Sequence, residues 1–164
     1  MKRVHALVVI ASLALFVPVL VHAQGAATGK ARIGTWKLNL SKSKIDPGSP
    51  TTYQSETRVY SDAGAQGVKT TATITGTDGK TTTRSYTSNY DGKDAPYTGN
   101  PVADSINIKA VDLNTADSIT KKDGKVAQNS HSVLSDGGKV LTITTTGTTT
   151  QGRKYTNVMV YEKQ

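Results

Sequence analysis

The chain contains no cysteine, so disulfides, thiolate metal ligands and a cysteine nucleophile are all excluded. Phenylalanine and tryptophan occur once each, as Phe16 and Trp36, and tyrosine is the main aromatic residue. Glutamate occurs twice, as Glu56 and Glu162. A fold of this composition has to be held by a buried core alone, and a chain of 164 residues is long enough for one such core. We therefore expect a single domain.

Residues that carry catalytic chemistry are scarce. Outside the first 23 residues His131 is the single histidine, which cannot supply the clustered ligands of a usual zinc site. The sequence has no G-x-S-x-G, no H-E-x-x-H and no glycine-rich phosphate loop before a helix. Many of the aspartates fall in turn-like segments, where their side chains favour turns. The sequence predicts no enzyme, metal or cofactor; the alternative is an enzyme that uses His131.

The first 23 residues have the organisation of an export signal. Lys2 and Arg3 form a basic start, an apolar run covers residues 6–21, and Val21-His22-Ala23 ends it as a small-residue cleavage motif. A retained membrane anchor is the alternative, but a spanning helix needs roughly 20 apolar residues and the run is short. We predict cleavage after Ala23, export to the periplasm or medium, and no membrane span afterwards.

The charge of the chain is positive but dispersed. Removing residues 1–23 takes away two basic residues and no acidic ones, so the formal charge falls from +8 to +6. Basic residues are adjacent after the signal only at Lys121-Lys122 and Arg153-Lys154. This distribution indicates a solvated surface rather than a basic patch for nucleic acid. We expect a monomer with no nucleic-acid partner.

The remaining sequence predicts an all-β domain over residues 34–164, preceded by a flexible Gly/Ala/Lys tether at residues 24–33. Threonine occurs 25 times, and β-branched residues favour strands. In the first segment Trp36, Leu38 and Leu40 alternate with polar residues, as in a strand with one buried face. Nine segments have this character: residues 34–40, 52–60, 67–77, 80–90, 105–111, 115–121, 125–134, 140–146 and 153–163. The residues that share a face are Tyr53, Thr57 and Val59 in the second segment, Val68, Thr70, Ala72 and Ile74 in the third, Arg84, Tyr86 and Tyr90 in the fourth, Ile106 and Ile108 in the fifth, and Leu141 and Ile143 in the eighth.

Short turns join these segments. Asp-Gly pairs at positions 78, 91, 123 and 136 are favoured hairpin turns, and 78–79 predicts a two-residue type I′ hairpin. Their spacing has two interpretations, an old hairpin duplication or plain turn chemistry. A long antiparallel meander leaves two exposed edges unless it closes into a barrel. Because an up-and-down barrel closes antiparallel only with an even strand count, we predict a tenth strand around residues 94–99.

An outer-membrane barrel is the competing exported β architecture. Such barrels need an apolar outward face with aromatic girdles. Here the residues that alternate with Trp36 include Lys37 and Asn39, and phenylalanine is missing after the signal. The pattern favours a barrel whose outside faces water.

The two ends of the domain resemble a known family. Gly34-Thr35-Trp36, continued by Lys37-Leu38, is similar to the opening of lipocalins and fatty-acid-binding proteins. The far end, with 136–144 running D-G-G-K-V-L-T-I-T and then Tyr161-Glu162-Lys163, is similar to the last two strands of a fatty-acid-binding protein. The chain thus resembles a calycin, of the bacterial exported type. The resemblance implies a barrel around a cavity for an apolar molecule, with Trp36 at the closed end.

Three departures from that family concern the ligand. Met159 stands where the family has the arginine of a carboxylate-binding Arg-x-Tyr, with Tyr161 as its tyrosine. An Arg-x-Tyr does occur at Arg153 and Tyr155, six residues earlier and beside a turn, where a surface role is the simpler interpretation. The family's helical lid is replaced by a connector at residues 41–51. These departures argue against a fixed fatty-acid carboxylate.

The resulting hypothesis is an exported, non-enzymatic, lipocalin-like protein that binds a small apolar or amphipathic molecule. The expected lining residues are Trp36, Tyr86, Tyr90, Met159 and Tyr161. The alternative is a structural or interaction barrel of the cell envelope whose interior is filled by polar and tyrosine side chains, with no ligand.

Overall fold

A computed structural model describes residues 18–164, so most of the predicted signal lies outside the described residues. Helix α1 (Pro18–Ala31) precedes ten strands, and three short 3₁₀ helices lie in the connections: η1 (Leu40–Lys42), η2 (Gly64–Gln66) and η3 (Asp136–Gly138). The strands are β1 (Gly34–Leu38), β2 (Ser55–Asp62), β3 (Val68–Thr75), β4 (Thr81–Ser88), β5 (Asp91–Pro96), β6 (Ser105–Ala110), β7 (Thr115–Lys122), β8 (Lys125–Ser135), β9 (Val140–Thr148) and β10 (Lys154–Lys163).

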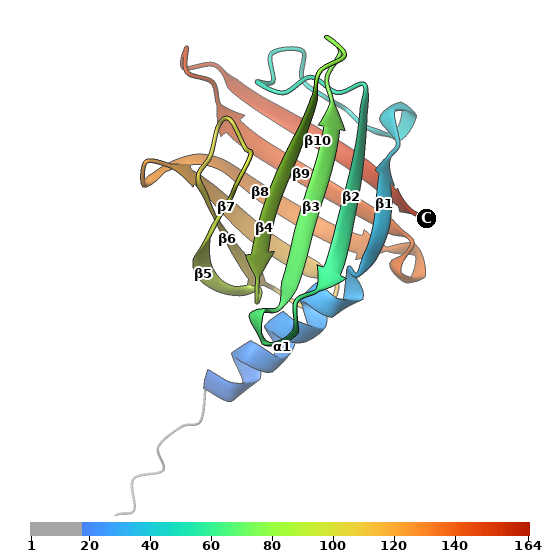
Figure 1. Ribbon diagram of the computed structural model, residues 1–164, viewed down its shortest axis with the longest axis vertical. Helices are drawn as coiled ribbons and strands as arrows, with labels where there is room; N and C mark the ends of the chain where they lie inside the picture. Colours follow the sequence, from blue (N-terminus) through green and yellow to red (C-terminus); the bar gives the residue numbers. More distant parts are fainter. Residues whose placement is uncertain (1–17) are drawn as a thin grey trace, which may run out of the picture.

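The ten strands form one antiparallel up-and-down sheet that curls into a nearly closed barrel (Figure 1). Strands β1 and β10 pair antiparallel, with Trp36 opposite Lys163, so the two ends of the domain meet. The seam of the barrel lies between β4 and β5. There one isolated bridge joins Ser85 of β4 to Thr98, two residues beyond the end of β5. Strand β5 is the tenth strand that an even count requires. The predicted all-β barrel is confirmed.

The alternation of side chains places the expected faces inward on most strands. In β3 the buried residues are Val68, Thr70, Ala72 and Ile74, as the sequence indicates. Strand β2 is different, because Glu56, Arg58 and Tyr60 face the interior while the apolar Val59 is 40% exposed. Pairing with β1 and β3 fixes the register of β2, and the fixed register buries a charged face.

The expected flexible tether at residues 24–33 is not found, because α1 occupies most of it and packs across one end of the barrel (Figure 1). Gly25 lies so close to the backbone that a Cβ there would be 2.7 Å from the Asn89 carbonyl oxygen. The Thr28 hydroxyl donates to the Asp112 carbonyl oxygen over 2.7 Å. These tertiary contacts outweigh the poor helix propensity of a Gly-rich segment.

One Asp-Gly pair forms a two-residue type I′ turn, and the pair at 78–79, where the sequence predicts such a turn, does not. Asp123 and Gly124 both have positive φ, 49° and 74°, as a type I′ turn between β7 and β8 requires. At the predicted 78–79 hairpin only Gly79 has positive φ. The loop there is wider, closed by the Gly76 N–H donating to the Lys80 carbonyl oxygen over 2.9 Å.

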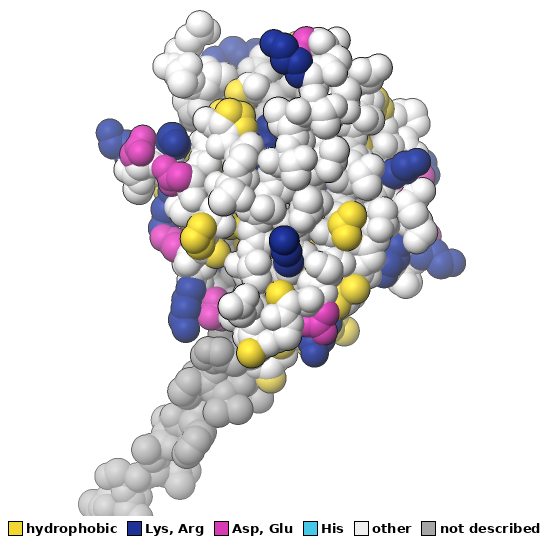
Figure 2. Space-filling model, in the orientation of Figure 1, with side chains coloured by type: hydrophobic (Ala, Val, Ile, Leu, Met, Phe, Trp, Pro, Cys, Tyr) yellow, Lys and Arg dark blue, Asp and Glu magenta, His cyan; other side chains and the backbone are white. Residues whose placement is uncertain are grey.

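The surface carries dispersed charges. On the face seen in Figure 2, basic and acidic side chains alternate and hydrophobic ones occur singly rather than in one patch. Within residues 18–164 no helix is both long and apolar enough to cross a membrane.

Candidate functional site

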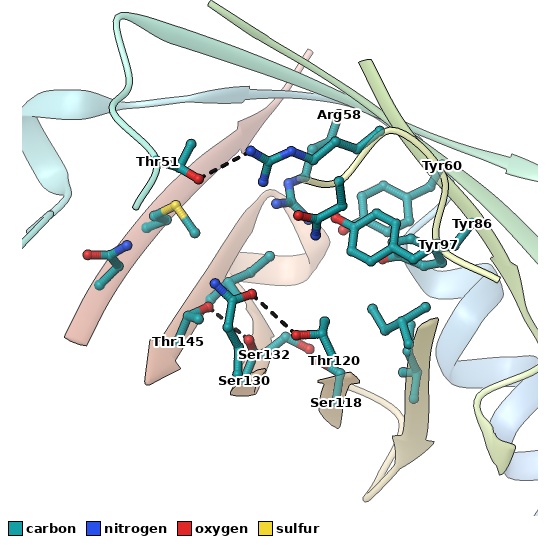
Figure 3. A pocket seen from close by; sticks show the side chains of 18 of the residues that line it. Thr51, Arg58, Tyr60, Tyr86, Tyr97, Ser118, Thr120, Ser130, Ser132 and Thr145 are labelled. Atoms are coloured by element: carbon teal, nitrogen blue, oxygen red, sulfur yellow. Dashed lines mark hydrogen bonds between the residues drawn. The ribbon is translucent and has the colours of Figure 1, made fainter. Parts of the chain in front are cut away.

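The barrel encloses a cavity of about 90 Å³ that is lined by side chains from both halves of the sheet. Figure 3 shows Arg58, Tyr60, Tyr86 and Tyr97 on one side of it. The opposite side carries hydroxyl groups from Ser118, Thr120, Ser130, Ser132 and Thr145, and between them lie Gln128 and the apolar Ile106, Ile108 and Ile143. The cavity therefore has a cationic and phenolic wall that faces a wall of hydroxyl groups and isoleucine side chains.

Two arginines of the first wall stand in one row across three strands. The register pairs Arg58 of β2 with Ala72 of β3, and Ala72 with Arg84 of β4. Neighbouring strands lie about 4.8 Å apart, so the two arginine backbones are separated by about 10 Å. The small side chain of Ala72 leaves space between the two guanidinium groups.

Arg58 is neutralised inside the protein. Its Nε–H donates to Oε1 of Glu56, whose side chain is fully buried. The Tyr161 hydroxyl donates to the other carboxylate oxygen, Oε2, over 2.9 Å. Burial alone would lower the pKa of Arg58, but the negative charge of Glu56 and smaller effects of Tyr161 and Tyr60 raise that pKa well above its usual range. Arg58 is thus a permanent cation with its counterion in place.

Arg84 has no such counterion within residues 18–164. Its side chain is 9% exposed, and its one hydrogen bond to the described residues is from an Nη–H to Oγ1 of Thr51, at 3.2 Å (Figure 3). Its buried Nε–H has no partner within residues 18–164. No carboxylate of the described chain forms an ion pair with it. The site therefore holds a desolvated cation with unused donors.

Arg32, at the closed end, is fully used by the fold. Its guanidinium donates to the carbonyl oxygens of Thr28 and Asn114, at 2.8 and 2.9 Å, and lies 5.7 Å from the centre of the Tyr90 ring. The Arg32 carbonyl oxygen in turn accepts from the Trp36 indole N–H at 2.9 Å. Arg32 joins α1 to the barrel and offers little to a ligand.

Three tyrosines that line the cavity, Tyr53, Tyr86 and Tyr97, stay neutral. Tyr86 and Tyr97 meet edge to face with their ring centres 5.1 Å apart. Burial raises the phenol pKa of both, and it raises the pKa of Tyr53 to about 12. At neutral pH these residues therefore act as aromatic surfaces and hydroxyl hydrogen-bonding groups rather than as acids or bases.

A second hollow of about 760 Å³ lies at the open end of the barrel. Apolar and polar residues of four connections line it, including Pro50, Pro101 and Val126. Gln128 lines both this mouth pocket and the inner cavity, and its amide donates to the Tyr155 hydroxyl over 2.6 Å. The Gln128–Tyr155 pair thus stands at the boundary between the two spaces.

The five predicted lining residues are divided between the cavity and its surroundings. Tyr86, Tyr90 and Met159 line the inner cavity. Trp36 is completely buried at the closed end, and Tyr161 is committed to Glu56. The role of all five in binding stays a prediction.

Two other candidates lie on the surface. His131 is half-exposed and its Nδ1 lies 2.7 Å from Oδ1 of Asp117. Arg153 pairs with Asp46 outside the cavity. No group of three or more potential metal ligands occurs among residues 18–164.

Sequence reasoning missed Glu56, Arg58 and Arg84 as site residues. For Arg84 a signal existed, because the alternation of side chains places it on the same face as Tyr86 and Tyr90, and that face points into the barrel. For β2 the apolar Val59 pointed to the wrong face. Only the register with β3 could have shown that the two arginines align.

Comparison with known proteins adds little beyond the fold. The sequence matches no family model and no curated protein. Among solved structures it is similar to the siderocalin Ex-FABP, described as functioning through dual ligand specificities. The identity is 10% over 82% of this chain and 74% of that chain, with a TM-score of 0.38. At these values the similarity carries no argument about function.

Proposed function

We propose that this protein is an exported, non-enzymatic binding protein for a small amphipathic molecule. The observation that carries the proposal is an inner cavity with charged and hydroxyl groups in its wall, which shares the lining residue Gln128 with a larger and more apolar mouth pocket. Two neighbouring spaces of different polarity suit a ligand with one polar and one apolar end. A filled core would instead avoid the unsatisfied buried donor of Arg84.

The cavity volumes limit the size of the ligand. Pockets for small molecules usually hold roughly 300 Å³ or more, whereas the inner cavity has about 90 Å³. The inner cavity therefore accommodates a head group rather than a long chain. The mouth pocket, with about 760 Å³, is large enough for the rest of the molecule.

The test is binding without turnover. Protein purified from its native host is denatured in organic solvent, and the released compounds are identified by mass spectrometry. The same protein, stripped of them, is titrated with an apolar fluorescent probe, which the released compounds should displace. Absence of both a released compound and probe uptake would overturn the proposal in favour of a filled structural barrel. Chemical conversion of the displacing compound would show that the protein is an enzyme instead.

A further inference from the structure

The buried guanidinium of Arg84 is the feature of the cavity that the fold itself does not explain. Burying an unpaired charge is costly, and proteins normally compensate it with a counterion or a full set of hydrogen bonds. Arg58 and Arg32 meet that requirement, the first with Glu56 and the second with backbone carbonyls. Arg84 meets it with Thr51 alone among the described residues.

The inward-facing charges do not balance. Arg32, Arg58 and Arg84 line the cavity, and Glu56 is the one acidic side chain among the buried residues of 18–164. Three positive charges against one negative charge leave the interior with an excess of two. Because water is largely displaced by side chains, this excess attracts an anion more strongly than surface lysines do.

The residues around Arg84 adjoin the mouth pocket along the chain. Its partner Thr51 follows Pro50, and the cavity residue Asn100 precedes Pro101; both prolines line the mouth pocket. An anionic group that enters from the open end would reach Arg84 at the upper part of the cavity. The apolar part of the same molecule would remain against the mouth.

We propose that the ligand is an amphipathic anion, a carboxylate or phosphate monoester, whose charged end binds the guanidinium of Arg84. This rests on the proposed binding function and narrows its ligand class. Arginine has a planar set of donors that suits the oxygens of either group. The bound anion supplies the counterion and the acceptor for Nε–H that residues 18–164 do not provide.

The experiment uses four probes with the same eight-carbon chain: octanoate, octyl phosphate, octan-1-ol and octylamine. Each is titrated into the mature protein by calorimetry at neutral pH and low salt. We expect at least one anion to bind at least about tenfold more tightly than the alcohol, since a hydrogen bond to a charged group is worth that much. The two anions distinguish carboxylate from phosphate recognition.

Variants then locate the effect. Arg84→Met should abolish the preference for the anion, leaving binding similar to that of octan-1-ol. The matched control is Arg153→Met, which removes the same charge from the exposed Asp46 pair at the open end and should leave the preference intact. If Arg84→Met does not fold, Thr51→Val, which removes the single hydrogen bond of Arg84, should reduce anion affinity severalfold.

Each contrary result has a distinct meaning. Equal affinity for alcohol and anions, or tighter binding of the amine, overturns the anion site and leaves the binding function standing. Equal losses in Arg84→Met and Arg153→Met overturn it as well, because they indicate general electrostatics. If the parent protein binds none of the four probes, the anion site is overturned. The proposed binding function is overturned as well only if protein from the native host also releases no compound.

Discussion

Arg58 and Arg84 face the same cavity from strands two apart in one sheet, yet their surroundings are opposite. Arg58 has a buried carboxylate against its Nε, and Tyr161 completes that carboxylate's hydrogen bonding. Arg84 has one threonine hydroxyl and an unused donor. The first arrangement is a finished piece of the core. The second leaves donors free among the described residues, as the proposed anion site requires.

Tyrosines surround both arginines. Raising the pH until these tyrosines ionise should produce the largest change in the stability of the protein. Burial raises the phenol pKa of Tyr53, Tyr86, Tyr90, Tyr97 and Tyr161 above the ordinary value of 10.0. Above pH 10 the unfolded chain loses these protons while the folded chain keeps them. Stability is thus complete below about pH 10 and falls as pH rises, by about 1.4 kcal/mol per pH unit for each phenol held neutral.

Urea unfolding between pH 8 and 11 measures this fall, and absorbance at 295 nm reports the phenolates. Five buried phenols predict a steep loss, with most phenolate appearing only as the protein unfolds. Tyr86→Phe removes one of these phenols, so the free energy of unfolding should fall less steeply with pH, by about 1.4 kcal/mol per pH unit. Titration of these phenols near pH 10 in the folded protein would show that water reaches the interior freely, and both arginines would then be solvated.

The next largest effect should come from Arg58→Met. The substitution leaves the Glu56 carboxylate buried with Tyr161 as its remaining partner. Removing one member of a buried ion pair typically costs about 3 kcal/mol or more. Urea unfolding followed by Trp36 fluorescence measures the loss. Adding Glu56→Gln should restore a large part of it, since the stranded charge disappears; no recovery would mean that Arg58 contributes through packing instead.

The alternation of polar and apolar residues predicted the inward faces of β3, β4, β6 and β9, because these strands each offer one clearly better face to the core. The requirement for an even strand number predicted β5. What alternation could not predict is β2, whose charged side faces inward. That choice is made by the neighbouring strands and by Tyr161, more than 100 residues away.

The candidate site was less predictable than the fold. The resemblance to fatty-acid-binding proteins predicts an arginine on the last strand, where this chain has Met159. The guanidinium groups come from β2 and β4 instead, and only the folded register aligns them. The helical cap α1 was missed for a related reason, since its helix depends on contacts with residues 89 and 112.

Tyr161→Phe tests the hydrogen bond to Glu56, the counterion of Arg58, and should lower the stability less than Arg58→Met does. Losing the hydroxyl leaves the Oε2 atom of Glu56 without its donor. We expect the free energy of unfolding to fall by about 1 to 2 kcal/mol. Tyr86→Phe is the matched control at neutral pH, because the Tyr86 hydroxyl makes no hydrogen bond to residues 18–164 and its loss should cost less. Equal losses would contradict the assigned role of Tyr161.

The smallest effect should belong to Arg84→Met, and it decides the comparison. The substitution strands no carboxylate, removes a desolvated charge and keeps an unbranched side chain of similar length. Its cost is limited to the hydrogen bond with Thr51, which relief of the buried charge offsets. We therefore expect the free energy of unfolding, measured without ligand in the same urea assay, to stay within about 0.5 kcal/mol of the parent or to rise. A loss as large as that of Arg58→Met would mean that Arg84 also serves the fold, and the distinction between a structural and a ligand-binding arginine would not hold.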